Sequence, residues 1–360
     1  MAKVRVATFN CENLFARPKI FDRPLAESKE LLAAVAKLHV ELVRPVFDQA
    51  TIAALKTELK GFITINDVRH KHTTPGIGAG AGAHNWLGWI EFVKDKINDV
   101  AVSNTAQVIA DTQAHVICLV EIENRPALKK FHDEILTKIK CTDTSEITKP
   151  YEHILLIDGN DERGIDVAVM SRLPVLGLRT HVHEMTTYKG KKVAQFSRDC
   201  LEVDIELPGG KKLTFMANHF KSMGYSAAGD PKSEERRRDQ AERVAKIVKE
   251  HKPAQNMVIV AGDLNSPPDA HSILPLSNHA DLYNVNLELP AGQRGTYTTD
   301  LDHKQLDYLF VSKPLKQKLS AMHVERRGSY KPTKWASYPS VTSDRTAASD
   351  HGSVVAEFSL

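Results

Sequence analysis

The chain has 360 residues, 42% of them hydrophobic and 26% charged, which is the composition of a folded globular protein and excludes a disordered chain. Its formal net charge of +3 is too small for a dedicated nucleic-acid-binding protein, although it allows a local basic patch. The four cysteines show no short paired spacing, so a zinc site is not expected. No apolar run approaches the ~20 residues of a membrane span, and the first residues form no signal-peptide pattern, so we expect a cytoplasmic protein.

The first predicted element is a strand at Val4–Phe9, and a different pattern follows it over residues 21–98. There, Leu31–Val46 and Thr51–Lys60 have the spacing of amphipathic helices, and Trp86–Ile97 is predicted as another helix. The glycine–alanine run at 76–83 has no strand before it, so it is predicted as a lid or linker and not as a dinucleotide loop. We interpret 21–98 as a helical insertion into a single domain of residues 1–360, with two separate domains as the alternative.

After residue 98, predicted strands and helices interleave. In chain order they are a helix at Asp99–Asp111, strands at His115–Val120, Asp166–Ser171, Leu201–Glu206 and Leu213–Asn218, a helix at Ser233–His251, and strands at Met257–Gly262, Leu306–Val311 and Val354–Phe358. This order indicates an α/β architecture. Several strands are almost continuously apolar, which is typical of strands buried on both faces.

Polar residues stand at or just beyond the ends of these strands. The oxygen donors among them are Asn10, Glu12, Glu121, Asp263, Asn265, Asp307 and Asp350, and the imidazoles are His219 and His351. Each one alone is explained by the preference of such residues for turns. Together they provide the hard oxygen ligands that Mg²⁺ prefers and the groups that phosphate hydrolysis needs.

Six motifs in order resemble those of the endonuclease/exonuclease/phosphatase superfamily, which includes pancreatic deoxyribonuclease and the abasic-site repair endonucleases. They are Thr8–Phe15, Leu119–Asn124, Asn218–Ser222, Gly262–Ser266 with its Gly-Asp-Xaa-Asn signature, Leu306–Phe310 and Ser349–His351. One such motif occurs by chance, but six in the same order form a specific signal. The resemblance implies a four-layer α/β sandwich, in which two packed mixed β-sheets are flanked by helices.

The same resemblance implies a magnesium site, with Mn²⁺ as a substitute ion. Glu121 is expected to be the main ligand. Asn10, Glu12 and Asp350 are expected nearby, bound directly or through water.

The resemblance also implies roles in the reaction. Asp263 is expected to position or activate the attacking water, and Asn265 to hold the phosphate. His351 is expected to contact the scissile phosphate or to transfer a proton, with Asp307 accepting from its other nitrogen, and His219 to stabilise the transition state. A carboxylate beside a histidine fixes the tautomer and favours the imidazolium, so the pairing makes physical sense.

Several basic residues are candidates for substrate binding. Arg163 and Arg198 have the planar fork that binds phosphate, with a surface turn as the alternative for each. Lys221, two residues after His219, is a third candidate. The run of arginines at 236–238 is interpreted as a solvated helix face, with a nucleic-acid backbone contact as its rival.

The favoured function is magnesium-dependent hydrolysis of phosphodiester bonds in DNA or RNA. The alternative enzyme is a phosphatase or phosphodiesterase for a lipid or a small phosphorylated molecule. A third hypothesis is a binding module that has kept the fold and lost catalysis. The complete set of polar positions argues against it. Loops around a shared site determine which substrate is bound, so the core motifs do not decide between these functions. No membrane association and no obligatory protein partner are expected.

Overall fold

The computed structural model describes residues 2–14, 16–67, 77, 80–96, 99–224, 227–298, 305–331 and 333–360. The chain folds into two compact units: the main unit comprises Met1–Phe15 and Asn98–Leu360, and the smaller unit comprises Ala16–Ile97. Across the described ranges, no helix has both the length and the apolar character needed to cross a membrane.

The main unit contains two six-stranded sheets. The first has the order β17 (Leu319–Glu325), β18 (Ser353–Ser359), β1 (Lys3–Leu14), β6 (Val116–Ile122), β8 (Asp166–Ser171), β7 (His153–Leu156). The second has the order β15 (Leu282–Asn284), β16 (Asp307–Ser312), β14 (Met257–Asp263), β13 (Lys211–His219), β12 (Cys200–Leu207), β9 (Val175–Arg179). A separate hairpin joins β10 (Met185–Tyr188) to β11 (Lys191–Ala194).

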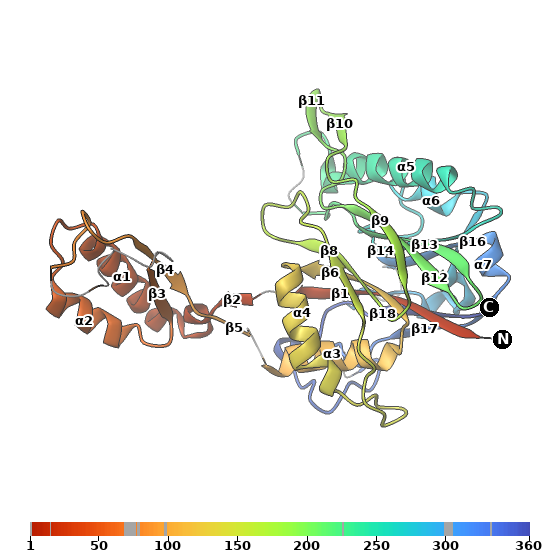
Figure 1. Cartoon of the computed structure of the whole chain (residues 1–360). Helices are drawn as coiled ribbons and strands as arrows, with labels where there is room; N and C mark the ends of the chain where they lie inside the picture. The colour runs from red at the N-terminus through yellow and green to blue at the C-terminus, as the bar shows by residue number, and fades with distance from the viewer. Residues whose placement is uncertain are drawn as a thin grey trace. The chain divides into compact units, whose positions relative to one another are not determined.

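Helices cover the outer face of each sheet, which makes four layers (Figure 1). They are α3 (Asp99–Thr112) and α4 (Arg125–Glu134) on the first sheet, and α5 (Glu234–Glu250) and α6 (Leu274–Ser277) on the second, while the short α7 (Lys313–Lys316) follows β16. The predicted four-layer α/β sandwich is therefore confirmed.

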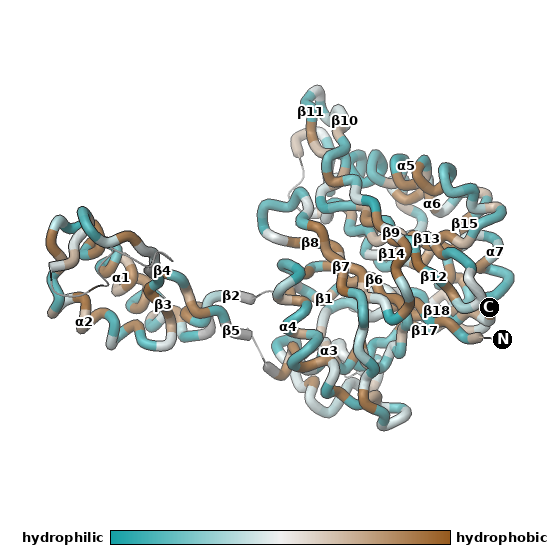
Figure 2. Tube along the Cα trace, viewed as in Figure 1, coloured by the Kyte–Doolittle hydropathy of each residue, from teal (hydrophilic) through white to brown (hydrophobic). Residues whose placement is uncertain are grey.

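Alternation along the strands explains why the layers form. In β6, Val116 and Cys118 belong to the core between the two sheets, while Ile117 and Leu119 pack with α3 and α4 on the other side. Successive strand residues point to opposite faces, so a strand covered on both sides must be apolar at nearly every position. Figure 2 shows β6 and β8 as largely hydrophobic, while α5 carries hydrophilic residues along much of its length.

The topology gathers the ends of several strands at one edge. β1 runs parallel to β6, and β13 runs parallel to β14, so the carboxyl ends of each pair meet. β16 is antiparallel to β14, and its first residue, Asp307, lies opposite Asp263. β18 is antiparallel to β1, so the residues just before it reach the same edge. The pairing therefore brings together the polar strand ends that the sequence analysis selected.

The smaller unit has its own hydrophobic core and contains α1 (Leu25–Leu42) and α2 (Gln49–Glu58). It also contains two strand pairs: β2 (Ala16–Pro18) with β5 (Lys94–Lys96), and β3 (Ile63–Asp67) with β4 (Gly88–Phe92).

The prediction of a helix over Trp86–Ile97 is wrong, because β4 and β5 lie in this range. Ile90 and Phe92 pack against the core of this unit while Trp89 and Glu91 are exposed, which is the two-residue period of a strand. Most of the glycine–alanine run, predicted as a lid or linker, lies outside the described residues.

Candidate active site

Three of the predicted site residues have an uncommon backbone conformation. Glu12, Glu121 and Asn265 have φ values of 47°, 63° and 49°, in the left-handed region that residues other than glycine rarely adopt. At Glu121 the pairing of β6 with β8 shifts register, as it does in a β-bulge. Strained residues and bulges persist where the surrounding structure fixes them, and they cluster at functional sites.

Gly262, the glycine of the Gly-Asp-Xaa-Asn signature, allows two strands to approach closely. Its φ is +135°, and a Cβ atom there would lie 1.8 Å from the carbonyl oxygen of Asn218 on the neighbouring strand. Only glycine fits at this position without moving β13 or β14. The glycine therefore sets the distance between His219 and Asp263, which face each other across the same strand pair.

Asn10 connects the two groups of acidic side chains. Its Nδ2 donates to Glu121 Oε1 at 3.3 Å and to Asp263 Oδ2 at 3.1 Å, and its Oδ1 accepts from the backbone N–H of Glu12 at 2.9 Å. In this arrangement the amide nitrogen, and not the oxygen, faces the carboxylates. Asn10 thus positions Glu121 and Asp263 relative to each other.

Glu12 lies beside Asp350, which comes from the other end of the chain. The backbone N–H of Asp350 donates to Glu12 Oε2 at 3.0 Å. Burial, followed by the nearby charge of Asp350, raises the pKa of Glu12 to about 7. Glu121 adds a further negative charge. Three carboxylates and their oxygen donors thus share one region, and a divalent cation would relieve their mutual repulsion. The residues present therefore fit a Mg²⁺ ion.

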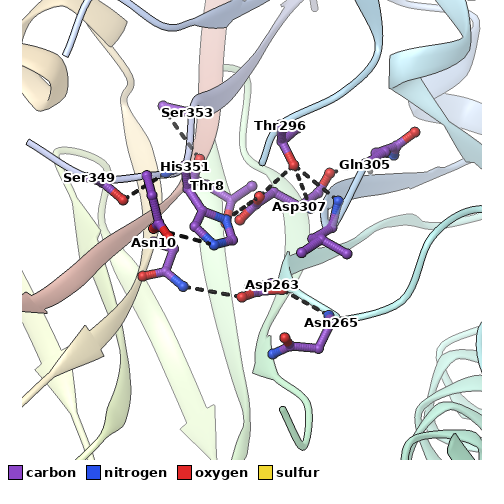
Figure 3. A network of polar contacts seen from close by, with 12 residues as sticks. Thr8, Asn10, Asp263, Asn265, Thr296, Gln305, Asp307, Ser349, His351 and Ser353 are labelled. Atoms are coloured by element: carbon purple, nitrogen blue, oxygen red, sulfur yellow. Dashed lines mark hydrogen bonds and ion pairs between the residues drawn. The ribbon is translucent and has the colours of Figure 1, made fainter. Parts of the chain in front are cut away.

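A second group is formed by Asp263, Asp307 and His351, which are all buried. His351 Nδ1 is 2.7 Å from Asp307 Oδ2, and the hydroxyl of Thr296 donates to the same carboxylate oxygen at 2.6 Å (Figure 3). Burial alone lowers the pKa of His351, but the charge and hydrogen bond of Asp307 outweigh it and raise the pKa to about 10. Burial, followed by the charge of Asp307, raises the pKa of Asp263 to about 7. One ligand atom from each of the three residues lies within 4.8 Å of the others.

His219 and Asn265 flank Asp263. His219 Nε2 is 3.7 Å from Asp263 Oδ2, and its Nδ1 is buried without a hydrogen-bond partner in the described part of the chain. Burial, followed by the positive charge of Arg198, lowers the pKa of His219 well below its ordinary value, so the ring is neutral. The backbone N–H of Asn265 donates to Asp263 Oδ1 at 2.8 Å.

Two arginines of the site, Arg163 and Arg198, contact the same aspartate. Arg163 contacts both carboxylate oxygens of Asp161, at 2.9 and 2.8 Å, and Arg198 Nη2 is 3.0 Å from Asp161 Oδ2. The Arg198 side chain is buried, and its Nε has no hydrogen-bond partner among the described residues. A buried guanidinium with an unused donor is well suited to an anion.

These residues surround one cavity of about 440 Å³ in the main unit. Its lining includes Asn10, Glu12, Glu121, Arg163, Arg198, His219, Asp263, Asn265, Asp350 and His351. Asp307 is not among the lining residues, but it contacts His351 Nδ1. Lys221 lines a neighbouring hollow of about 470 Å³ and not this cavity. Of the three predicted substrate-binding residues, Arg163 and Arg198 therefore line the cavity and Lys221 does not.

The arginine run at 236–238 has a different role from either reading of the sequence. Arg236 and Arg237 are buried, and they donate to backbone carbonyls, those of Gln195 and Lys221 among them. Arg238 donates to the carbonyl oxygen of His271. The first two arginines thus fix loops to the start of α5.

Three residues of the site were not predicted from the sequence. Thr296 orients Asp307, Asp161 holds the two arginines, and Tyr297 lines the cavity with its ring 5.0 Å from that of His351. All three lie in loops, where no periodicity marks them. The one local signal is that Asp161 stands two residues before Arg163.

The model of the Endonuclease/Exonuclease/phosphatase family matches residues 64–330, more than half of the chain. The chain belongs to this family. Members of the family are hydrolases of phosphoester bonds, which agrees with the chemistry of the cavity. The match does not extend to Asn10, Glu12, Asp350 or His351, so the place of these residues in the site rests on the geometry.

Solved structures of the family are similar to the chain. The endonuclease/exonuclease/phosphatase from Bacteroides vulgatus covers 100% of both chains at 13% identity and a TM-score of 0.53. The one from Beutenbergia cavernae has 20% identity over 72% of this chain and 66% of that chain, with a TM-score of 0.49. TDP2 from D. rerio, complexed with a single-strand DNA product, has 18% identity over 73% and 95% of the two chains, with a TM-score of 0.47. At 13% identity, the similarity to the Bacteroides vulgatus structure shows a shared fold and nothing more. A comparison with curated proteins gave no match.

Proposed function

We propose that this protein is a Mg²⁺-dependent phosphodiesterase that cleaves nucleic acid. The observation that carries the proposal is the meeting of two groups in one cavity: the carboxylates of Glu12, Glu121 and Asp350, and the buried Asp263 with His351. The three carboxylates suit a hard divalent cation. Asp263 and His351 suit the proton transfers that accompany attack of water on a phosphodiester.

Glu121, with Glu12 and Asp350, would hold the ion, and Asn10 would position Glu121. When bound, Mg²⁺ supplies Lewis-acid stabilisation of the negative charge that develops on the phosphoryl oxygens. Mn²⁺ substitutes for it, because it prefers the same oxygen ligands.

Asp263 orients the attacking water and accepts its proton. A pKa of about 7 places this carboxyl close to the value at which a general base works best near neutral pH. Asn10 and the backbone N–H of Asn265 hold its two oxygens in place. The amide of Asn265, which lines the cavity, contacts the phosphate.

His351 donates a hydrogen bond from Nε2 to a phosphate oxygen. Its pKa of about 10 keeps the ring protonated at neutral pH, and Asp307 holds the ring through Nδ1. His219 is neutral and contributes a hydrogen bond without adding charge. Arg198 and Arg163 provide the positive charge that the substrate phosphate meets.

A polymeric substrate is supported by the extension of the site. Arg163 lines both the catalytic cavity and the neighbouring hollow that contains Lys221. A substrate with phosphates on both sides of the scissile bond can use both spaces, whereas a small phosphomonoester uses only the first.

The test is a side-by-side assay of the purified protein with Mg²⁺ on plasmid DNA, single-stranded DNA, RNA and phosphatidylinositol phosphates. Asp263→Asn serves as the control for contaminating activity. Shortened nucleic-acid chains that the control does not produce support the proposal. Hydrolysis of the lipid alone would replace nucleic acid with a phospholipid, and hydrolysis of no substrate would overturn the proposal.

A further inference from the structure

A further cavity lies at the end of β6 opposite Glu121. Its volume is about 330 Å³, and its lining includes Gln113, His115, Thr144, Glu146, Lys149 and Arg172. From His115, just before β6, to Glu121 the chain advances six residues. At roughly 3.3 Å per strand residue, about 20 Å separates this cavity from the catalytic one.

His115 presents a hydrogen-bond donor there. Its Nδ1 accepts from the backbone N–H of Arg5 at 3.1 Å, so the ring proton of the neutral form is on Nε2. That Nε2–H has no hydrogen-bond partner in the described ranges of the chain. Burial, followed by the charges of Arg172, Arg5 and Lys149, lowers the pKa of His115. Nε2 remains a donor in either protonation state.

Arg172 is held in one orientation with donors to spare. Its Nε donates to the carbonyl oxygen of Lys149 at 3.2 Å, and its guanidinium stacks over the ring of Tyr151 at 4.3 Å from the centroid. These two contacts fix the plane of the fork, and neither Nη group has a hydrogen-bond partner among the residues that the structure describes. No ion pair of Arg172 or Lys149 is found within the part of the chain that the structure describes.

The charged side chains that line this cavity carry a net positive charge. Arg5 is neutralised by Glu357, with Nε and Oε2 2.9 Å apart. Glu146 is the single carboxylate among the described lining residues, and it faces two cations, Arg172 and Lys149. An oriented fork, an ammonium group and a fixed N–H donor around one cavity form a preorganised anion site.

We propose that this cavity binds a phosphate-type oxyanion, as a site separate from the catalytic cavity. The ligand is either free phosphate or a phosphate of a bound polymer, because both offer the same tetrahedral oxygens to Arg172, Lys149 and His115. The proposal does not depend on the function proposed above, since no catalytic residue takes part.

The test is calorimetric titration of the full chain with inorganic phosphate at constant ionic strength, in the presence of a chelator. Arg172→Gln should weaken binding at least about 10-fold, the effect of losing a charge-assisted hydrogen bond, and Lys149→Gln should weaken it less. Lys130→Gln, an exposed lysine on α4, is the matched control. His351→Ala alters the catalytic cavity, which also meets phosphate, so it should leave intact the binding that Arg172→Gln removes.

Arg172→Lys keeps the charge and loses the fork, so its affinity should fall between those of the unmodified chain and Arg172→Gln. This variant keeps the test valid if Arg172→Gln does not fold by circular dichroism. Equal phosphate affinity in all variants, or loss of binding in His351→Ala alone, would overturn the proposal.

A second arm identifies the source of the phosphate. If the ligand belongs to a polymer, Arg172→Gln should raise KM for oligonucleotides that span both cavities and leave KM for a dinucleotide unchanged. If the ligand is free phosphate, calorimetry should show the loss while both KM values stay the same. A chain that hydrolyses no nucleic acid would end the proposed function, yet the calorimetric result would still stand.

Discussion

Two histidine–carboxylate clusters in the main unit each contain a buried pair, His351 with Asp307 in one and His181 with Glu202 in the other. In the cluster that we propose is catalytic, here called the catalytic cluster (His219, Asp263, Asp307 and His351), His351 Nδ1 lies 2.7 Å from Asp307. In the second, here called the structural cluster (His181, Glu184, Glu202, Arg243 and His251), His181 Nε2 lies 2.5 Å from Glu202.

The clusters differ in what remains unpaired. In the catalytic cluster, Asp307 Oδ1 and His219 Nδ1 are buried without a partner among the described residues, and the group borders a cavity. In the structural cluster, both ring nitrogens of His181 are paired and His251 occupies the second oxygen of Glu202. Buried polar atoms without a partner occur at functional sites, whereas a saturated network stabilises the fold.

The largest expected effect is on turnover. Asp263→Asn and His351→Ala should each reduce kcat at least ~100-fold, the lower range for loss of a general acid or base. Asp204→Asn, on the surface of β12 in a pair with Lys212, is the matched control. Because Asp307 acts through His351, the losses in Asp307→Asn and His351→Ala should not multiply in the double variant. Full multiplication would show that the two residues do not work as a pair.

Glu202→Gln should reduce stability and have little effect on turnover. It removes the charge and one of the two acceptor oxygens that His181 and His251 use, so we expect a loss of about 2–4 kcal/mol in the free energy of unfolding, while kcat changes less than about twofold. Denaturant titration measures the loss. Glu206→Gln, on the same strand and without an ion pair among the described residues, is the control. A fall in kcat with unchanged stability would place Glu202 in the catalytic machinery.

The stability lost in Glu202→Gln should depend on pH. Burial raises the pKa of Glu202, but the hydrogen bonds from His181 and His251 outweigh this and lower it to about 2, from an ordinary value of 4.5. Its contribution is therefore present above pH 4.5 and disappears as the pH falls toward 2. The pKa of His181 is raised from 6.5: burial opposes the shift, and the hydrogen bonds of Glu202 and Glu184 cause it.

The contribution of His181 is complete below pH 6.5 and is lost as the pH rises through its folded value. The difference in Tm between the unmodified chain and Glu202→Gln should therefore be largest between pH 4.5 and 6.5 and shrink on both sides. A difference that stays constant from pH 3 to pH 9 would contradict the assigned pairing.

The strand ends of the catalytic site were predictable because the chemistry there follows the strand pattern. Glu121 and Asp263 each close an apolar run, and parallel pairing of β1 with β6 and of β13 with β14 brings such ends together. The smaller unit was harder to predict, because Gly88–Phe92 is too short for its two-residue period to be distinguished from a helix. Thr296 and Asp161 act through loops that bring together distant segments, and the sequence does not encode that geometry locally.

The smallest expected effect on chemistry comes from the smaller unit, which we propose is an insertion that influences substrate access. β2 pairs with β5, so the two ends of this unit lie side by side and a short linker can join them. Replacing Ala16–Ile97 with such a linker should leave kcat on a minimal phosphodiester within about threefold, since the unit has its own core. KM for long substrates should change. Loss of turnover on the minimal substrate, with long polymers affected no more, would make the unit part of the catalytic scaffold.

The central claim, that carboxylates of this cavity hold a catalytic divalent ion, is tested most directly by the rate of phosphodiester hydrolysis as a function of Mg²⁺ concentration. The unmodified chain and Glu206→Gln should be inactive in excess chelator and share one Mg²⁺ dependence. Glu121→Gln should be inactive or need at least about 10-fold more Mg²⁺ for half its maximal rate. Full activity in excess chelator, or the same Mg²⁺ dependence in Glu121→Gln, would contradict the account.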